Sequence, residues 1–153
     1  MTRTVAVDFD GVIHAYSKGW QDGTIYDDPV PGAEEAVKGL LAGYAVMVFT
    51  TRTDLRAVGD YVRDRLHVPV LVARDDVPRE FWDMLDMVYI TNRKLPAVAY
   101  IDDRGIRFGN WPLALADLER YEPAAPETGL DRVAAAVRKA RGGDPPVQVR
   151  GFA

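Results

Sequence analysis

Acidic and hydroxyl side chains follow several apolar runs of this chain at the point where each run ends. Asp8 and Asp10 close the first run, Thr50 follows the run YAVMVF, and Asp102 and Asp103 follow the run AVAYI. Residues two apart in a strand point to the same face, so the first two aspartates could address one ligand together. Such a set of carboxylates with a hydroxyl could carry out phosphoryl transfer.

Phosphoryl transfer needs a nucleophile, a proton carrier and groups that bind the phosphate oxygens. One aspartate could attack phosphorus and form an aspartyl-phosphate, and the other could protonate the leaving oxygen and later take a proton from water. The hydroxyl of Thr50 and the ammonium of Lys94 could bind the equatorial oxygens, where charge collects in the transition state. Carboxylates from two run ends could hold Mg²⁺, a hard cation that prefers oxygen ligands.

The elements that must position these residues can be read from apolar patterns. Runs with almost no polar residue are typical of parallel strands buried on both faces, and they span 4–9, 44–50, 68–73 and 97–101. Helical spacing predicts helices over 31–43, 54–66 and 78–87. The segment VYIT at 88–91 is compatible with a small extra strand or with a loop.

Strands that alternate with helices predict a Rossmann-like α/β fold, a three-layer sandwich with a central parallel sheet and helices on both sides. Ligands of such sheets bind beyond the carboxyl ends of the strands. The acidic and hydroxyl residues lie at these ends, so we expect them to converge on one edge.

One ordinary domain accounts for most of the chain. With 153 residues, of which 48% are hydrophobic, the chain can bury a single core, and we expect the catalytic domain over residues 1–121. Residues 122–153 read as a Pro-rich connector, a C-terminal helix and a tail. The C-terminal helix could dock on the sheet or on another subunit, so a homo-oligomer formed through it is one expectation.

Composition excludes several classes of protein. The net charge of -4, without a long block of like charge, argues against tight non-specific DNA binding. The chain has no cysteine, so neither a disulfide framework nor a thiolate metal site can form. No apolar segment has signal-peptide length at the N-terminus, and no run approaches the about 20 residues that cross a bilayer. We therefore expect a cytoplasmic protein without membrane association.

Four segments resemble, in order and spacing, the signature motifs of the haloacid dehalogenase-like (HAD) hydrolase superfamily. The segments are DFDGVI at 8–13, VFTTR at 48–52, Lys94 in NRKLP, and YIDDR at 100–104. The resemblance covers most of the chain. It implies a HAD-like α/β fold, a Mg²⁺ cofactor and phosphomonoesterase activity through an aspartyl-phosphate.

The resemblance also implies a role for each matching residue. Asp8 is expected to be the nucleophile, and Asp10 the general acid/base, whose backbone carbonyl also faces the metal. Thr50 is expected to supply the hydroxyl and Lys94 the cation. The two aspartates of YIDDR, Asp102 and Asp103, are expected to complete the Mg²⁺ site, with the first of them preferred for direct contact.

The segment HAYSKGWQDGTIYDDPVPG after Ile13 is too short for a folded helical cap, the element that usually selects the substrate in this superfamily. The chain therefore resembles the capless branch, whose open sites suit bulky phosphates or closure by a partner subunit. KLPAVAYIDDR is similar to small phage and bacterial HAD proteins, some of them near the phosphatase half of polynucleotide kinase-phosphatase. Three functions are left open: a phosphohydrolase for a nucleotide or other small phosphate ester, a 3′-phosphatase on DNA or RNA ends, and a non-catalytic phosphate-binding or assembly module.

Substrate contacts are expected from the flap after Asp10 and from the end of the second apolar run. A glycine lets the chain turn away without placing a side chain in the site. Flap side chains could stack on a base or bind a sugar, or they could only pin the loop to the domain. The candidate substrate-binding residues are Gly11, His14, Tyr16, Lys18, Trp20, Thr51 and Arg52.

Overall fold

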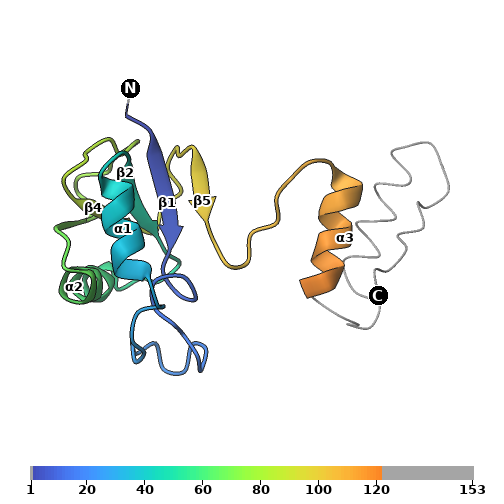
Figure 1. The fold of residues 1–153 in the computed structure, drawn as a ribbon, viewed down its shortest axis with the longest axis horizontal. Helices are drawn as coiled ribbons and strands as arrows, with labels where there is room; N and C mark the ends of the chain where they lie inside the picture. Colours follow the sequence, from blue (N-terminus) through green and yellow to red (C-terminus); the bar gives the residue numbers. More distant parts are fainter. Residues whose placement is uncertain (1, 122–153) are drawn as a thin grey trace. The chain divides into compact units, whose positions relative to one another are not determined.

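The computed structural model describes residues 2–121 of the chain. The chain divides into two compact units, Met1–Asp103 and Arg104–Ala153, and the first carries the sheet (Figure 1). The helix α3 (Trp111–Tyr121) belongs to the second unit. The predicted connector, C-terminal helix and tail lie outside the described residues, and so does the expected oligomer contact. The domain division at residue 121 therefore stays a prediction.

Five parallel strands form the sheet of the first unit. They are β1 (Thr4–Asp8), β2 (Ala45–Phe49), β3 (Val70–Val72), β4 (Val88–Thr91) and β5 (Ala99–Ile101), in the spatial order β3-β4-β2-β1-β5. The segment 88–91, whose sequence allowed a strand or a loop, is a fully buried strand between β2 and β3. Because β1 lies between β2 and β5, its carboxyl end has a neighbouring strand end on each side.

The register of the strands brings three strand ends to one level. Asp8, the last residue of β1, pairs with Phe49, the last residue of β2. Val7 pairs with Ile101, the last residue of β5, so Asp102 follows at the level of Asp8. Parallel pairing therefore collects the residues after β1, β2 and β5 at one edge of the sheet.

Both helices of the first unit, α1 (Ala33–Leu41) and α2 (Leu55–Leu66), pack on the same face of the sheet. The side chain of Asp54 caps α2 by accepting a hydrogen bond from the backbone N–H of Ala57 at 3.0 Å. Gly59 lets α2 approach β3, because a Cβ there would lie 2.5 Å from a methyl group of Val72. The core beneath these helices includes Val5, Val7, Val37, Val46, Val48, Val58, Val62, Val88 and Ile90.

Irregular segments cover the opposite face, so the prediction of a helix over 78–87 is wrong. The indole of Trp82 is buried there and stacks on the ring of Tyr89 with 4.8 Å between centroids. Helical spacing would turn Phe81 and Leu85 toward the sheet together, but both are exposed. Burial of the larger indole outweighs the local helical preference. The first unit thus has helices on one face of the sheet, not on both as predicted.

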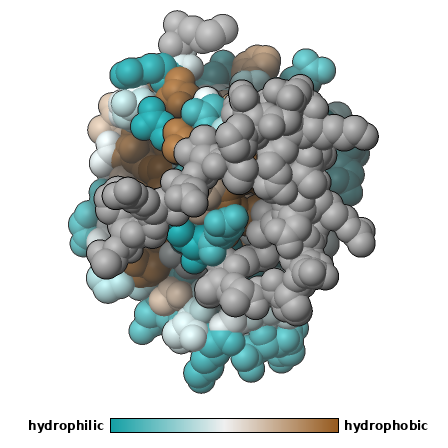
Figure 2. All heavy atoms as spheres, turned by 90° about the vertical axis from the view of Figure 1, so that its right-hand side faces the viewer, coloured by the Kyte–Doolittle hydropathy of each residue, from teal (hydrophilic) through white to brown (hydrophobic). Residues whose placement is uncertain are grey.

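The surface of the first unit is mixed in hydropathy. Several apolar side chains remain exposed, among them Phe81, Val98 and Ile101. Among the described residues that are coloured in Figure 2, hydrophobic and hydrophilic ones are interspersed. Among residues 2–121, no helix has the length and apolar character needed to cross a membrane.

Candidate active site

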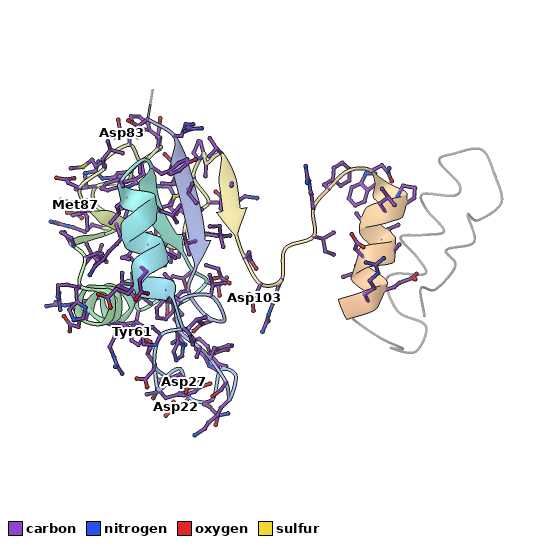
Figure 3. The ribbon with its side chains drawn as sticks, viewed as in Figure 1. Asp22, Asp27, Tyr61, Asp83, Met87 and Asp103 are labelled. Carbon is purple, nitrogen blue, oxygen red and sulfur yellow. The ribbon has the colours of Figure 1, made fainter. Side chains whose placement is uncertain are left out.

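An acidic cluster lies at the carboxyl edge of the sheet. Asp8 ends β1, whereas Asp102 and Asp103 follow β5, and Figure 3 shows Asp103 just beyond the arrowhead of that strand. One carboxylate oxygen from each of the three aspartates lies within 4.8 Å of the other two. Three hard oxygen donors at this spacing fit a divalent cation such as Mg²⁺.

The surroundings of Asp8 make its negative charge costly. Burial, with a smaller contribution from the charges of Asp102 and Asp103, raises the pKa of Asp8 from 3.8 to about 7. A hydrogen bond of 2.7 Å from the backbone N–H of Phe9 to Oδ1 acts in the opposite direction. A bound cation would counter the repulsion among the three carboxylates and favour the ionised form of Asp8.

Gly11 lies directly against this cluster. Its φ angle of 83° is in the left-handed region, and a Cβ at this position would overlap the Oδ2 atom of Asp103. Glycine adopts this φ without strain and leaves room for the carboxylate. The sharp turn predicted after Asp10 is confirmed, and the neighbour that requires a glycine in it is Asp103.

Asp10 is bonded to two buried side chains and its carboxylate is not part of the acidic cluster. Arg52 donates to it twice, from Nε to Oδ2 at 2.7 Å and from Nη2 to Oδ1 at 2.9 Å. The Nδ1 atom of His14 lies 2.8 Å from Oδ1. Because three hydrogen bonds hold this side chain, the predicted metal contact of Asp10 rests on its backbone carbonyl.

His14 was predicted to contact the substrate. It is fully buried, so in this structure it supports Asp10 and does not face a substrate. The backbone N–H of Asp27 donates to its Nε2 atom at 3.1 Å. This bond assigns the proton to Nδ1 and makes Nδ1 the donor to Asp10. Four aromatic rings lie against the imidazole, those of Phe9, Tyr16, Tyr26 and Tyr61.

Arg52, also a predicted substrate contact, is only 5% exposed and is used within the protein. Its Cζ atom lies 5.6 Å from the ring centroid of Phe9 and 4.9 Å from that of Trp20. Its Nη1 atom donates to the carbonyl of Gly23 at 2.5 Å. Arg52 therefore joins the end of β2 to Asp10 and to the loop between β1 and α1.

This loop, residues 15–29, is fastened to α2. The hydroxyl of Tyr61 donates to the carbonyl of Asp27 at 2.9 Å, and Arg65 forms an ion pair with Asp28 at 3.0 Å. Burial raises the pKa of Tyr61 to about 12, so its hydroxyl keeps its proton and remains a donor. Figure 3 shows Tyr61 next to the part of the loop that carries Asp27.

Two of the predicted flap contacts remain accessible to a ligand. Trp20 is 53% exposed, and Lys18 is exposed with its ammonium 5.8 Å from the ring centroid of Tyr26. Tyr16 is only half-buried, but its ring is tilted against the imidazole of His14 at 5.8 Å. Lys18 and Trp20 are therefore the flap side chains best placed to meet a substrate.

The two residues predicted to bind phosphate oxygens differ in their surroundings. Thr50 is buried at the end of β2, and its Oγ1 atom accepts a hydrogen bond from the backbone N–H of Arg52 at 3.2 Å. Thr51 beside it is exposed. Lys94 is exposed, with its ammonium 5.1 Å from the ring centroid of Tyr100 in β5. The phosphate-binding roles of Thr50, Thr51 and Lys94 stay predictions.

Sequence reasoning missed three residues that support Asp10 indirectly. Gly23 acts through its backbone carbonyl and Asp27 through its backbone N–H, groups that every residue type except proline supplies, so their side chains give no indication of the contact. Tyr61 lies on α2, where its spacing is that of an ordinary core residue. Only the path of the loop brings these residues together.

The fold and the site together define an α/β protein with an acidic cluster at the carboxyl edge of a five-stranded parallel sheet. Comparison of the chain with protein-family models, with curated proteins and with solved structures finds no match. The chemistry of the site is therefore the basis for a functional assignment.

Proposed function

We propose that this protein is a Mg²⁺-dependent phosphomonoesterase of the HAD type that acts through an aspartyl-phosphate on Asp8. The observation that carries the proposal is the group of three carboxylates, from Asp8, Asp102 and Asp103, within 4.8 Å of one another at two adjacent strand ends. The raised pKa of Asp8 supports it, because burial and like charges commonly perturb functional carboxylates. The resemblance of four segments to the HAD motifs supports the same function.

The residues present fit a divalent cation. Asp8, Asp102 and Asp103 would hold it through carboxylate oxygens, and the backbone carbonyl of Asp10 could add a further ligand. When bound, Mg²⁺ would supply positive charge for the phosphate oxygens and for the carboxylates around them.

The side chains of the protein then divide the chemistry. An oxygen of Asp8 attacks phosphorus, the bond from phosphorus to the ester oxygen breaks, and a proton from the carboxyl of Asp10 passes to the leaving oxygen. Water next attacks the phosphorus of the aspartyl-phosphate, and its proton passes to the carboxylate of Asp10. These steps regenerate Asp8 and release inorganic phosphate. Thr50 and Lys94 are proposed to bind the phosphate oxygens that do not react.

Phosphate release from a panel of esters tests this function. We expect the wild-type protein to hydrolyse p-nitrophenyl phosphate and at least one nucleotide in the presence of Mg²⁺. The rate should fall by a factor of at least about 100 when EDTA removes the metal. A rate that EDTA leaves unchanged would contradict the metal-dependent mechanism. Phosphate binding without turnover across the whole panel would favour the non-catalytic module.

The exposure and position of Trp20 indicate a substrate that carries a nucleobase. Its exposed ring is backed by the guanidinium of Arg52 at 4.9 Å, and this guanidinium also binds Asp10. An exposed ring held in this way offers a stacking surface near the proposed acid/base. We therefore put a nucleotide first and a 3′-phosphate on a DNA or RNA end second. A higher kcat/KM on a 3′-phosphorylated oligonucleotide than on the matching mononucleotide would favour the second.

The Trp20→Leu variant is expected to raise KM for a nucleoside monophosphate about 5- to 150-fold, because stacking on a base contributes roughly 1–3 kcal/mol. Glycerol phosphate, which has no base, should show nearly the same KM in the variant and in the wild type. Steady-state assays on both esters measure the two values, with Trp111→Leu as the control at another exposed tryptophan. An equal change in KM for both esters would show that Trp20 does not contact a base.

A further inference from the structure

Hydrogen bonds occupy particular positions on the carboxylate of Asp10. An ionised carboxylate offers about four acceptor positions, two on each oxygen. Nδ1 of His14 and Nη2 of Arg52 both bond to Oδ1, whereas Nε of Arg52 bonds to Oδ2. Among the described donors this leaves one position on Oδ2, and the side chain is still 18% exposed. Proton exchange with an ester or with water would occur at this position.

Loop 15–29 holds both donors through its backbone. The N–H of Asp27 binds Nε2 of His14, which keeps the imidazole proton on Nδ1 and directed at Asp10. The carbonyl of Gly23 accepts the third hydrogen bond of the Arg52 guanidinium. The orientation of the Asp10 carboxylate thus depends on a loop that is itself fastened to α2.

We infer that Arg52 and His14 are positioning residues. They direct the remaining Oδ2 position of Asp10, where the transferred proton is carried, at the leaving oxygen, and loop 15–29 holds them in place. The inference rests on the proposed phosphatase function and adds the groups that orient its proton carrier. Without this orientation, proton delivery to the leaving oxygen slows while attack by Asp8 remains intact. The loss of rate is then largest for alkyl phosphates, whose leaving oxygen needs a proton most.

A double-mutant cycle on kcat/KM tests this inference, with glycerol phosphate and p-nitrophenyl phosphate as substrates. Arg52→Lys keeps the charge but loses the planar fork that binds both oxygens of Asp10. We expect it to lower kcat/KM about 10- to 100-fold on glycerol phosphate and about 3-fold or less on the aryl ester. In the Asp10→Asn background the same substitution should lower kcat/KM by less than about 2-fold, because Arg52 acts through Asp10.

Matched controls separate positioning from general damage. Arg63→Lys alters an exposed arginine of α2 that pairs with Asp60, and it should leave both substrates unaffected. His14→Phe keeps an aromatic ring but removes the Nδ1 donor to Asp10. It should repeat the ester-dependent loss of kcat/KM, also if Arg52→Lys does not fold. His67→Phe is its control at the other histidine of the chain, which is exposed.

The outcomes distinguish this inference from the function on which it rests. The positioning role would be overturned if Arg52→Lys lowered kcat/KM equally on both esters. It would also be overturned if the effects of Arg52→Lys and Asp10→Asn on kcat/KM were additive. Either result would leave the phosphatase function in place. A wild-type protein without Mg²⁺-dependent turnover would overturn the proposed function and the positioning role with it.

Discussion

The Asp8→Asn variant is expected to lose Mg²⁺-dependent phosphate release by at least about 10³-fold. Asparagine has nearly the shape of aspartate, and its Oδ1 atom can still accept the hydrogen bond from the backbone N–H of Phe9. It has no anionic oxygen that can attack phosphorus, so no aspartyl-phosphate forms. Single-turnover phosphate release at saturating Mg²⁺ measures the loss directly.

Acid quenching gives a second measure of the same step. Wild-type protein mixed with a ³²P-labelled ester should retain label on the chain when quenched, and the Asp8→Asn variant should retain none. Asp75→Asn, at an exposed aspartate after β3, serves as the matched substitution and should behave as the wild type. Full activity or retained label in Asp8→Asn would exclude Asp8 as the nucleophile.

The metal-free protein is expected to lose stability through Asp8 as the pH rises from about 4 to about 7. Burial first, and then the charges of Asp102 and Asp103, raise the pKa of Asp8 from 3.8 to about 7, so the folded protein binds this proton more tightly than the unfolded chain does. Below this window both states hold the proton, and above it neither does, so stability falls within it. Each pKa unit corresponds to about 1.4 kcal/mol, and solvent screening reduces the total to the order of 2 kcal/mol.

Urea unfolding of the wild type and of Asp8→Asn in EDTA isolates this contribution. Hydrogen bonds lower the pKa values of Asp22, Asp27 and Glu34, which gives both proteins a stability gradient of the opposite sign at low pH. The difference in unfolding free energy between the two proteins cancels these groups. We expect the free energy of unfolding of the variant to rise relative to that of the wild type from pH 4 to pH 7. Addition of Mg²⁺ should reverse this relative gain in stability. If the unfolding free energies of the two proteins changed with pH in parallel, ionisation of Asp8 would not reduce the stability of the fold.

Much of the sheet could be predicted from local sequence patterns. The runs at 4–9, 44–50, 68–73 and 97–101 correspond to β1, β2, β3 and β5. The inner strands β1 and β2 are apolar because they are buried on both faces, whereas the edge strands β3 and β5 are apolar although they are only partly buried. VYIT has the same character, but its four residues were too few to separate a strand from a loop by pattern alone. Its place between β2 and β3 depends on pairing with strands distant in sequence.

The segment 78–87 shows how tertiary contacts override a helical pattern. Phe81 and Leu85 have helical spacing, yet only Trp82 is inserted against the sheet, where it stacks on Tyr89. Spacing does not reveal which aromatic ring the neighbouring strand can accept, because that depends on the side chains facing it.

Within the candidate site, the sequence by itself determined that Asp8, Asp102 and Asp103 lie at strand ends, because apolar runs and the polar residues that close them are local features. Only the tertiary structure decided that His14 and Arg52, expected to meet substrate, are turned inward onto Asp10. Their partners in loop 15–29 are backbone groups that any sequence could offer. The register of the strands and the path of this loop are long-range properties, and they determine which polar groups support the site and which can face a ligand.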